Sequence, residues 1–195
     1  LAEKCGCPVI LENDGKAAAM AELANGALKD CCNAAVFIIG TGVGGGIYCN
    51  GSLLHGMMHP EAGHVLIRKR ADDTYEGKCP YHKTCLEGLA AGPAIEERWG
   101  RKAVELKNRA EVWELEADYL AQAIVDYIMV ISPEMVILGG GVMHQEQLFP
   151  LIRKKVTEYV AGYVKTEELN DMEHFIVPAS LHDDQGICLL YTSPS

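Results

Sequence analysis

Two short apolar runs, each followed by a cluster of glycines, constrain the fold of this chain more than any other feature. Ala34–Ile39 precedes Gly40-Thr41-Gly42-Val43-Gly44-Gly45-Gly46, and residues 135–138 precede Gly139-Gly140-Gly141. Runs of this length that are rich in Val and Ile are typical of buried strands. Alanine-rich composition or helical spacing predicts helices over residues 16–28, 114–131 and 148–163. Strands that alternate with helices predict an α/β fold.

Further strands are expected near both ends of the chain and beside the first glycine cluster. Residues 8–11 and 175–177 have the composition of short strands. Residues 47–49 and 52–54 flank Asn50-Gly51, a pair that supplies the positive φ angles of a type I′ turn. The sequence therefore predicts a β-hairpin directly after the glycines.

Composition and charge argue against two classes of protein. The chain has 195 residues, 49% of them hydrophobic, which suits one good-sized domain or one domain with part of another. Its 17 Lys and Arg residues against 27 Asp and Glu give a net charge of −10. A nucleic-acid binder is not expected, because phosphate contacts need clustered cations. The longest apolar stretch, residues 123–131, contains Asp126 and falls short of the roughly 20 residues that span a bilayer.

Both ends of the sequence look cut. The chain starts at Leu1, with no initiator Met and no signal-peptide pattern, so the cytoplasm is the expected compartment. Its eight cysteines are then expected to be reduced thiols or metal ligands. Residues 188–195 look like the translation of a widely used transposase sequencing adapter, and we expect them to be a non-native tail.

The glycine clusters are candidate ligand sites. Glycines let backbone N–H groups approach an anion, and Thr41 adds a hydroxyl donor, so residues 40–46 are expected to form a loop that suits a phosphate. It lacks the Gly-Lys-Ser/Thr ending of a Walker A loop, and a tight strand connection is an equally good interpretation. Gly139 to Gly141 follow a strand of an α/β sheet, where ligands often lie, but a plain strand-to-helix turn would have the same sequence.

Two cysteines and two histidines form the clearest local signal. Cys79, His82 and Cys85 recur at three-residue spacing, and His64 offers a fourth ligand from the preceding region, which we expect to be a strand. Such a set suits a tetrahedral zinc ion, and four protein ligands would make the site structural. The alternative is a group of unpaired cysteines and surface histidines.

Carboxylates follow the first strand and flank the candidate metal ligands. Asn13 or Asp14 would serve as a helix N-cap, and local sequence alone favours that role. Asp14 is also placed to accept a proton from a substrate hydroxyl. Glu61 and Glu87 lie close in sequence to His64 and Cys85, so a bound metal could aim both carboxylates at the hydroxyl groups of a ligand. Two solvated glutamates are the alternative.

Together these motifs resemble the ROK family (repressors, open reading frames and kinases), and within it the fructokinase branch. The resemblance spans residues 8–187. Its motifs are Glu12-Asn13-Asp14, the cluster at 40–46, His59-Pro60-Glu61-Ala62-Gly63-His64, the long segment 79–95 with Arg98-Trp99-Gly100, and Asp183-Asp184-Gln185-Gly186.

The resemblance implies an actin-like ATPase (ribonuclease H-like) fold, with two domains closing over a cleft that holds ATP, Mg²⁺ and a hexose. Residues 1–14 would end a small domain and form a hinge, and residues 15–187 would form most of the larger domain, with a structural zinc knot at 64–85. The family's Asp-x-Gly-Gly-Thr-Lys phosphate loop has no counterpart here. The fragment alone is therefore expected to be inactive.

The resemblance also implies roles for individual residues. Asp14 would be the general base. Sugar contacts would come from Asn13, Glu61, His64 and Glu87. Nucleotide contacts would come from Gly40, Thr41, Gly42, Gly44, Gly92, Gly139, Gly140 and Gly141. The intact parent would be a homodimer that phosphorylates D-fructose, with mannose or glucose as alternative substrates. A sugar-sensing repressor would instead carry a helix-turn-helix segment before Leu1.

Overall fold

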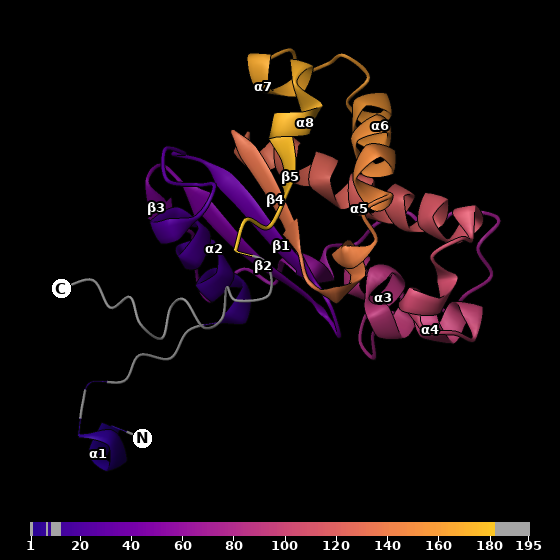
Figure 1. Ribbon diagram of the computed structural model, residues 1–195, viewed down its shortest axis with the longest axis horizontal. Coiled ribbons are helices and arrows are strands. Elements are labelled where there is room, and N and C mark those ends of the chain that lie inside the picture. Colours follow the sequence, from indigo (N-terminus) through magenta and orange to yellow (C-terminus); the bar gives the residue numbers. More distant parts are fainter. Residues whose placement is uncertain (1, 7, 9–12, 182–195) are drawn as a thin grey trace.

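A five-stranded mixed sheet carries the fold in the computed structural model, which describes residues 2–6, 8 and 13–181 (Figure 1). The strands lie in the order β3-β2-β1-β4-β5. β1 pairs antiparallel with β2 and parallel with β4, and β4 pairs parallel with β5. Their bounds are β1 Ala34–Ile39, β2 Val43–Cys49, β3 Ser52–Leu53, β4 Met135–Gly139 and β5 Ile176–Pro178. The predicted α/β class is confirmed.

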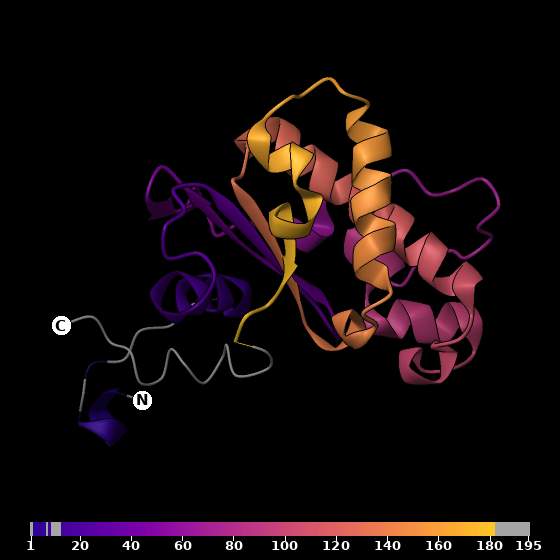
Figure 2. The ribbon, with the colours of Figure 1, turned by 45° about the horizontal axis from the view of Figure 1, so that its top comes forward.

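Helices cover both faces of the sheet, as Figures 1 and 2 show. The α2 helix lies on one face, where it packs on Val36 and Ile137. On the other face α3, α5 and α6 surround Phe37 and Ile39. Successive residues of a strand point to opposite faces, so β1 supplies both cores. The helices are α1 Ala2–Cys5, α2 Asp14–Asn25, η1 Ala62–His64, α3 Leu86–Ala90, α4 Gly92–Trp99, η2 Ala103–Leu106, α5 Ala110–Ile131, η3 Gly141–His144, α6 Leu148–Val160, α7 Glu167–Asn170 and α8 Met172–Phe175.

Consecutive glycines in β2 let segments approach it closely from both faces. A Cβ on Gly46 would lie 2.4 Å from the carbonyl oxygen of Gly15 in α2. A Cβ on Gly45 would lie 2.3 Å from the Cβ of Ala62 in η1, on the opposite face. Real Cβ atoms do not approach neighbours this closely, so α2 and η1 reach the strand only because these positions lack side chains. The expectation that residues 40–46 form one continuous loop is therefore wrong for residues 43–46, which belong to β2.

Most predicted elements appear, with shifted ends. The predicted strand at 34–39 and the Asn50-Gly51 turn are confirmed, with φ angles of 51° and 74° in the turn. The helix predicted at 16–28 begins at Asp14, and the one predicted at 148–163 ends at Val160, where Ala161 turns left-handed. Phe175 was predicted in a strand but closes α8. The strand predicted at 8–11, the Asp183-to-Gly186 motif and the tail at 188–195 lie wholly or mostly outside the described residues.

A buried carboxylate ties α2 to the chain that follows β5. Glu22 is fully buried, and its Oε1 accepts a hydrogen bond of 2.9 Å from the backbone N–H of Ser180. Its Oε2 accepts one of 3.1 Å from the N–H of Ala27. These bonds satisfy a charge that would otherwise be costly to bury. They hold α2, and with it the start of the helix at Asp14, against the sheet.

None of the helices in the described part of the chain is long and apolar enough to cross a membrane.

We expect the change Gly46→Ala to destabilise the chain by about 1–3 kcal/mol, because the added methyl group would force α2 away from β2. Urea unfolding followed by circular dichroism measures the loss. Gly56→Ala is the matched control, since Gly56 lies in an exposed loop where its nearest contact to a Cβ would be at 3.9 Å. Equal stability of the two variants would contradict the close packing of α2 on β2.

Glu116 in α5 gives a second prediction. Its side chain is buried, and burial raises its pKa well above the usual range, with Arg98 acting in the opposite direction. The folded chain then holds a proton that the unfolded chain releases at a pH near 4.3, so Glu116 lowers stability as pH rises above that value. The stability of Glu116→Gln relative to the parent chain should therefore increase as pH rises above about 4.3 toward neutral pH.

Urea unfolding across that pH range measures the difference between the two chains. Glu114→Gln, at an exposed position of the same helix, serves as the control. If the stability of Glu116→Gln runs parallel to that of the parent chain at every pH, Glu116 does not hold the proton.

Candidate active site and metal centre

The four predicted metal ligands lie together. One ligand atom from each of His64, Cys79, His82 and Cys85 lies within 4.8 Å of all the others. The Nδ1 of His64 is 3.8 Å from the Sγ of Cys79 and 3.6 Å from the Sγ of Cys85, and the Nδ1 of His82 is 3.7 Å from the Sγ of Cys79. Both thiols are buried, whereas His82 is exposed.

These separations fit a tetrahedral zinc ion. Zinc binds sulfur at about 2.3 Å and nitrogen at about 2.0–2.1 Å, which places neighbouring S and N ligands about 3.6 Å apart. The three distances between His64 or His82 nitrogen and cysteine sulfur, 3.6–3.8 Å, are close to this value. Two thiolates and two imidazoles leave no open coordination position, so the site suits a structural ion.

Close approach of two glycines to the backbone of Lys83 brings the ligands together. A Cβ on Gly88 would lie 1.9 Å from the carbonyl oxygen of Lys83, and one on Gly77 would lie 2.1 Å from the same atom. Gly77 has a φ of +92°, which favours glycine. The sequence predicts that His64 comes from a strand region, but it ends the short helix η1. Cys85 directly precedes α3.

The two cysteine thiols of the candidate metal centre have pKa values that are shifted in opposite directions. Burial raises the pKa of the Cys85 thiol to about 11, against an opposing hydrogen bond from the backbone of Gly88. Burial also raises the pKa of Cys79, but hydrogen bonds from the backbone of His82 and Tyr81 outweigh it, so that pKa is lowered. The backbone N–H of His82 lies 3.5 Å from the Cys79 sulfur. The backbone therefore favours a thiolate at Cys79, the form that binds metals.

Glu87 connects the metal ligands to the first glycine turn. Its Oε1 lies 3.9 Å from the Nε2 of His64, the ring nitrogen that does not face the thiols. Its Oε2 accepts a hydrogen bond of 3.0 Å from the backbone N–H of Val43. A Cβ on Gly42 would lie 2.7 Å from that oxygen, so the turn needs a glycine there. Glu87 is thus a positioned carboxylate and not the solvated one of the alternative interpretation.

Glu61 is held more loosely. Its side chain is exposed, and its Oε1 lies 2.9 Å from the Nε2 of His59. Its backbone carbonyl accepts a hydrogen bond of 2.9 Å from the N–H of His64, which places it at the start of η1.

Asn13 and Asp14 begin α2. The Oδ1 of Asn13 accepts hydrogen bonds from the N–H groups of Gly15 and Lys16, at 3.0 and 3.3 Å, which is the N-cap arrangement that local sequence favoured. Asp14 is exposed, and its Oδ1 accepts a bond of 2.8 Å from Gly15. The same oxygen would lie 3.4 Å from a Cβ on Gly44, so the carboxylate borders β2.

Two of the three predicted carboxylates border the first half of β2, and the third belongs to a residue whose sequence neighbour packs on the same strand. Asp14 borders Gly44, Glu87 bonds Val43, and Glu61 precedes Ala62, which packs on Gly45. β3 pairs only with Tyr48 and Cys49, so among the described residues no strand covers the outer edge of β2 before Tyr48. α2 and η1 reach β2 from opposite faces, so Asp14, the first residue of α2, and Glu61, which directly precedes η1, both lie beside this strand. This arrangement suits a small polyol whose hydroxyl groups donate to carboxylates.

Four of the predicted nucleotide residues line one pocket. Gly40, Thr41, Gly92 and Gly141 contribute to an open pocket with a volume of about 480 Å³. The N–H of Gly92 donates a hydrogen bond of 2.8 Å to the carbonyl oxygen of Gly40, which joins the turn after β1 to the start of α4. The remaining lining residues are Pro93, Glu96, Lys102, Ala103, Val104 and Val142.

The other predicted nucleotide residues lie elsewhere around the same strand ends. Gly139 and Gly140 line a separate pocket beside Met143 and Phe149. Gly140 has a φ of +90°, and a Cβ there would lie 2.5 Å from the carbonyl oxygen of Ile39. Gly42 closes the β1–β2 turn over Glu87, and Gly44 belongs to β2. Sequence reasoning missed Lys102, a cation that lines the first pocket, because it lies in a connection with no motif of its own.

The chain is similar in sequence to known proteins. The sequence model of the ROK family matches residues 1–188. A Bacillus subtilis protein that carries a provisional fructokinase name is 48% identical over 181 residues, which are 92% of this chain and 60% of that protein. A fructokinase from Pediococcus pentosaceus is 41% identical over 180 residues, which are 92% of this chain and 62% of that protein. The chain thus spans about 60% of the length of these relatives.

A solved structure shares the fold. The crystal structure of a ROK family glucokinase from Streptomyces griseus, in complex with glucose and AMPPNP, superposes with a TM-score of 0.76 at 22% sequence identity. The match covers 96% of this chain and 68% of that one. The predicted actin-like ATPase fold is thereby confirmed.

If the four-residue cluster binds zinc, elemental analysis of the purified chain should find about one zinc per molecule. The double change Cys79→Ser and Cys85→Ser should abolish zinc uptake and lower the thermal unfolding temperature, because binding energy at a structural site contributes to folding. Cys32→Ser is the control, since Cys32 is an exposed free thiol. A metal-free parent chain as stable as the double variant would refute the site.

Proposed function

The chain belongs to the ROK family, and on that premise we propose that it forms most of the larger domain of a kinase that transfers the γ-phosphoryl group of ATP to a hexose. D-fructose is the favoured substrate, because the fructokinases compared above are 41–48% identical to this chain. The observation that carries the proposal is that the carboxylates of Asp14 and Glu87 both border the first half of β2, with Glu61 directly before η1 and a glycine-lined pocket at the turn before β2. Since the chain spans about 60% of its relatives, the activity belongs to the intact protein.

Asp14 is the proposed general base. A sugar hydroxyl is a weak nucleophile, and phosphoryl transfer proceeds through a loose transition state in which alignment and charge stabilisation dominate. Asp14 is exposed at the first turn of α2, so a substrate can reach its carboxylate. It would orient the attacking hydroxyl and accept its proton as the new bond to phosphorus forms. A base in this role contributes about 10²–10⁴-fold to the rate.

Sugar binding is proposed for Asn13, Glu61, His64 and Glu87. The carboxylates would accept hydrogen bonds from the hydroxyl groups that do not react, and the Nε2 of His64 faces away from the thiols and is free to face the sugar. The bond between Glu87 and Val43 holds the side chain in place before substrate arrives. Fewer side-chain rotamers are then lost when the sugar binds.

The glycine turns are proposed to hold the nucleotide. Gly40, Thr41, Gly42 and Gly44 would face the phosphates, Gly139, Gly140 and Gly141 would face the adenosine side, and Gly92 would also contact the nucleotide. Positions without side chains let backbone N–H groups approach phosphate oxygens. Mg²⁺ bound with ATP would neutralise charge that develops on the phosphates.

Zinc is the proposed structural metal, held by the Nδ1 atoms of His64 and His82 and the thiolates of Cys79 and Cys85. With four protein ligands it would supply rigidity and not a reactive water. Its position beside Glu87 would fix the sugar-binding carboxylate relative to the sheet.

The remaining proposals concern the intact protein. Residues 1–14 would belong to the hinge and the small domain, and residues 15–187 to the larger domain. We place the protein in the cytoplasm, where ATP is available and thiols such as Cys79 and Cys85 stay reduced. By family resemblance it would act as a homodimer.

In the full-length protein, Asp14→Asn should lower the rate of fructose phosphorylation by about 10²–10⁴-fold, because the amide cannot accept the proton. Fructose binding, measured by calorimetry, should persist. A coupled assay for fructose 6-phosphate measures the rate.

Asp171→Asn is the matched control. Asp171 is also an aspartate at a helix start, where its Oδ1 accepts a hydrogen bond of 3.3 Å from the N–H of His174. This variant should keep the parent rate. Parent-like turnover by Asp14→Asn would contradict its assignment as the base.

A further inference from the structure

Residues 65–78 form an irregular segment, here called the strap, that connects two of the four metal ligands. The strap starts after His64 and ends before Cys79. At its start the carbonyl oxygen of Val65 accepts a hydrogen bond of 3.0 Å from the N–H of Leu86, and at its end the N–H of Lys78 donates one of 2.8 Å to Gly88. The two ends of the strap are therefore held side by side at α3.

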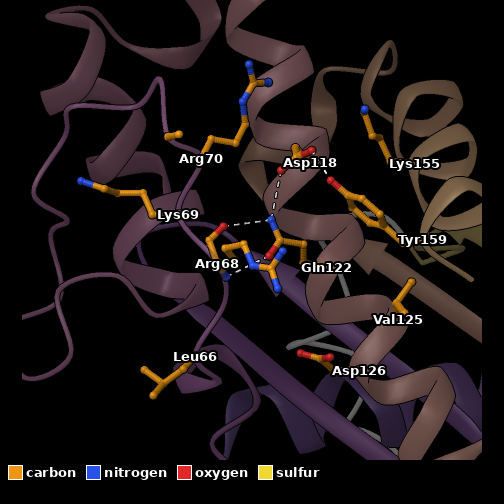
Figure 3. Close-up of a pocket in the computed structure, with 11 residues that line it drawn as sticks. Leu66, Arg68, Lys69, Arg70, Asp118, Gln122, Val125, Asp126, Lys155 and Tyr159 are labelled. Carbon is orange, nitrogen blue, oxygen red and sulfur yellow. Dashed lines mark hydrogen bonds between the residues drawn. The ribbon is translucent and has the colours of Figure 1, made fainter.

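The first half of the strap is fixed to α5 through its backbone, as Figure 3 shows. The side-chain amide of Gln122 accepts a hydrogen bond of 2.8 Å from the N–H of Arg68 and donates one of 3.0 Å to the carbonyl oxygen of the same residue. Gln122 also donates a bond of 3.0 Å to Asp118, whose other oxygen accepts one from the hydroxyl of Tyr159 in α6. The Gln122 side chain that bonds Arg68 is thus itself fixed by residues of α5 and α6.

The second half is fixed by a buried ion pair. Asp73 and Arg98 lie 3.2 Å apart, and their side chains are only 4% and 6% exposed. The hydroxyl of Tyr119 in α5 donates a hydrogen bond of 2.6 Å to Asp73. Arg98 belongs to α4 and also donates a bond of 2.9 Å to the carbonyl oxygen of Leu89 in α3. Its guanidinium lies over the ring of Tyr75, 4.7 Å from the centroid.

We propose that these contacts hold the strap in place without a metal, so that Gln122 and Arg98 are positioning residues for the metal centre. The proposal rests on the metal centre proposed above. None of the bonds that fix the strap involves a metal ligand, yet the strap determines how far His64 lies from Cys79.

The physical reason is the cost of closing a loop. A metal that joins the two ends of a free segment must remove the conformational freedom of that segment. A strap that is already fixed at Arg68 and Asp73 has lost most of that freedom during folding. Zinc then meets ligands near their final positions, and more of its binding energy is retained as affinity.

The test compares the zinc affinity of the parent chain with that of Gln122→Ala, by competition with a chromophoric chelator at fixed pH. We expect zinc to bind the variant about tenfold more weakly, the size of effect seen when residues that support metal ligands are removed. Arg98→Lys, which keeps the charge beside Asp73 but loses the planar donor geometry, should weaken zinc binding in the same direction.

Gln147→Ala is the matched control. Gln147 is also half-buried and donates a hydrogen bond of 3.2 Å to a backbone carbonyl, that of Lys107, which lies outside the strap. A general loss of stability would affect both glutamine variants, whereas a positioning role lowers the zinc affinity of Gln122→Ala alone. Equal zinc affinity in the parent chain and Gln122→Ala contradicts the role of the strap. A parent chain that binds no zinc contradicts the metal centre itself.

Hydrogen exchange in the zinc-stripped chain provides a second measurement. The Arg68 amide should remain protected in the parent chain and lose protection in Gln122→Ala. If residues 66–78 exchange rapidly in the stripped parent chain, the metal orders the strap, and the proposal is wrong.

Discussion

The close contact between α2 and β2 determines where the chemistry of this chain can lie. Because Gly44, Gly45 and Gly46 carry no side chains, the start of α2 and the η1 segment reach the same strand from opposite faces. β1 pairs with residues 43–48 of this strand, whereas the short β3 pairs only with Tyr48 and Cys49, so among the described residues the first half of β2 keeps an edge that no strand covers. Asp14 begins α2 and Glu61 directly precedes η1, so both lie beside this strand although 46 residues separate them in the sequence. Any side chain at Gly45 or Gly46 would push one of the two segments away.

The candidate metal centre adds a second constraint on the position of Glu87 at the start of β2. It links η1, residues 79–85 and α3, and α3 contains Glu87. Glu87 in turn bonds the backbone at the start of β2, so the metal ligands and the glycine turn are connected through one side chain. A sugar held by these carboxylates would lie next to the pocket lined by Gly40 and Gly92. The proposed transfer of a phosphoryl group depends on this proximity.

Local sequence predicted the parts of this arrangement that depend on short-range chemistry. The strand at 34–39, the Asn50-Gly51 turn and the clustering of the four candidate metal ligands follow from composition and spacing, and the structure shows all three, although His64 ends η1 and does not follow a strand. Local sequence failed where distant contacts decide. The sequence predicts a loop for residues 43–46, but they form the first half of β2. Gly15 and Ala62, each more than 15 residues away in the sequence, pack so closely on Gly45 and Gly46 that no side chain fits there. The buried pair of Asp73 and Arg98 was missed because no periodicity marks an irregular strap.

The central claim is that Asp14 and the carboxylates beside the metal ligands serve one substrate. A crystal structure of the intact protein with fructose and a non-hydrolysable ATP analogue tests it most directly. The account predicts one fructose molecule bonded to Glu61 and Glu87, with the hydroxyl nearest the γ-phosphate within about 3.2 Å of the Asp14 carboxylate. A sugar bound by Glu61 and Glu87 with Asp14 outside hydrogen-bonding reach of every hydroxyl group would contradict it.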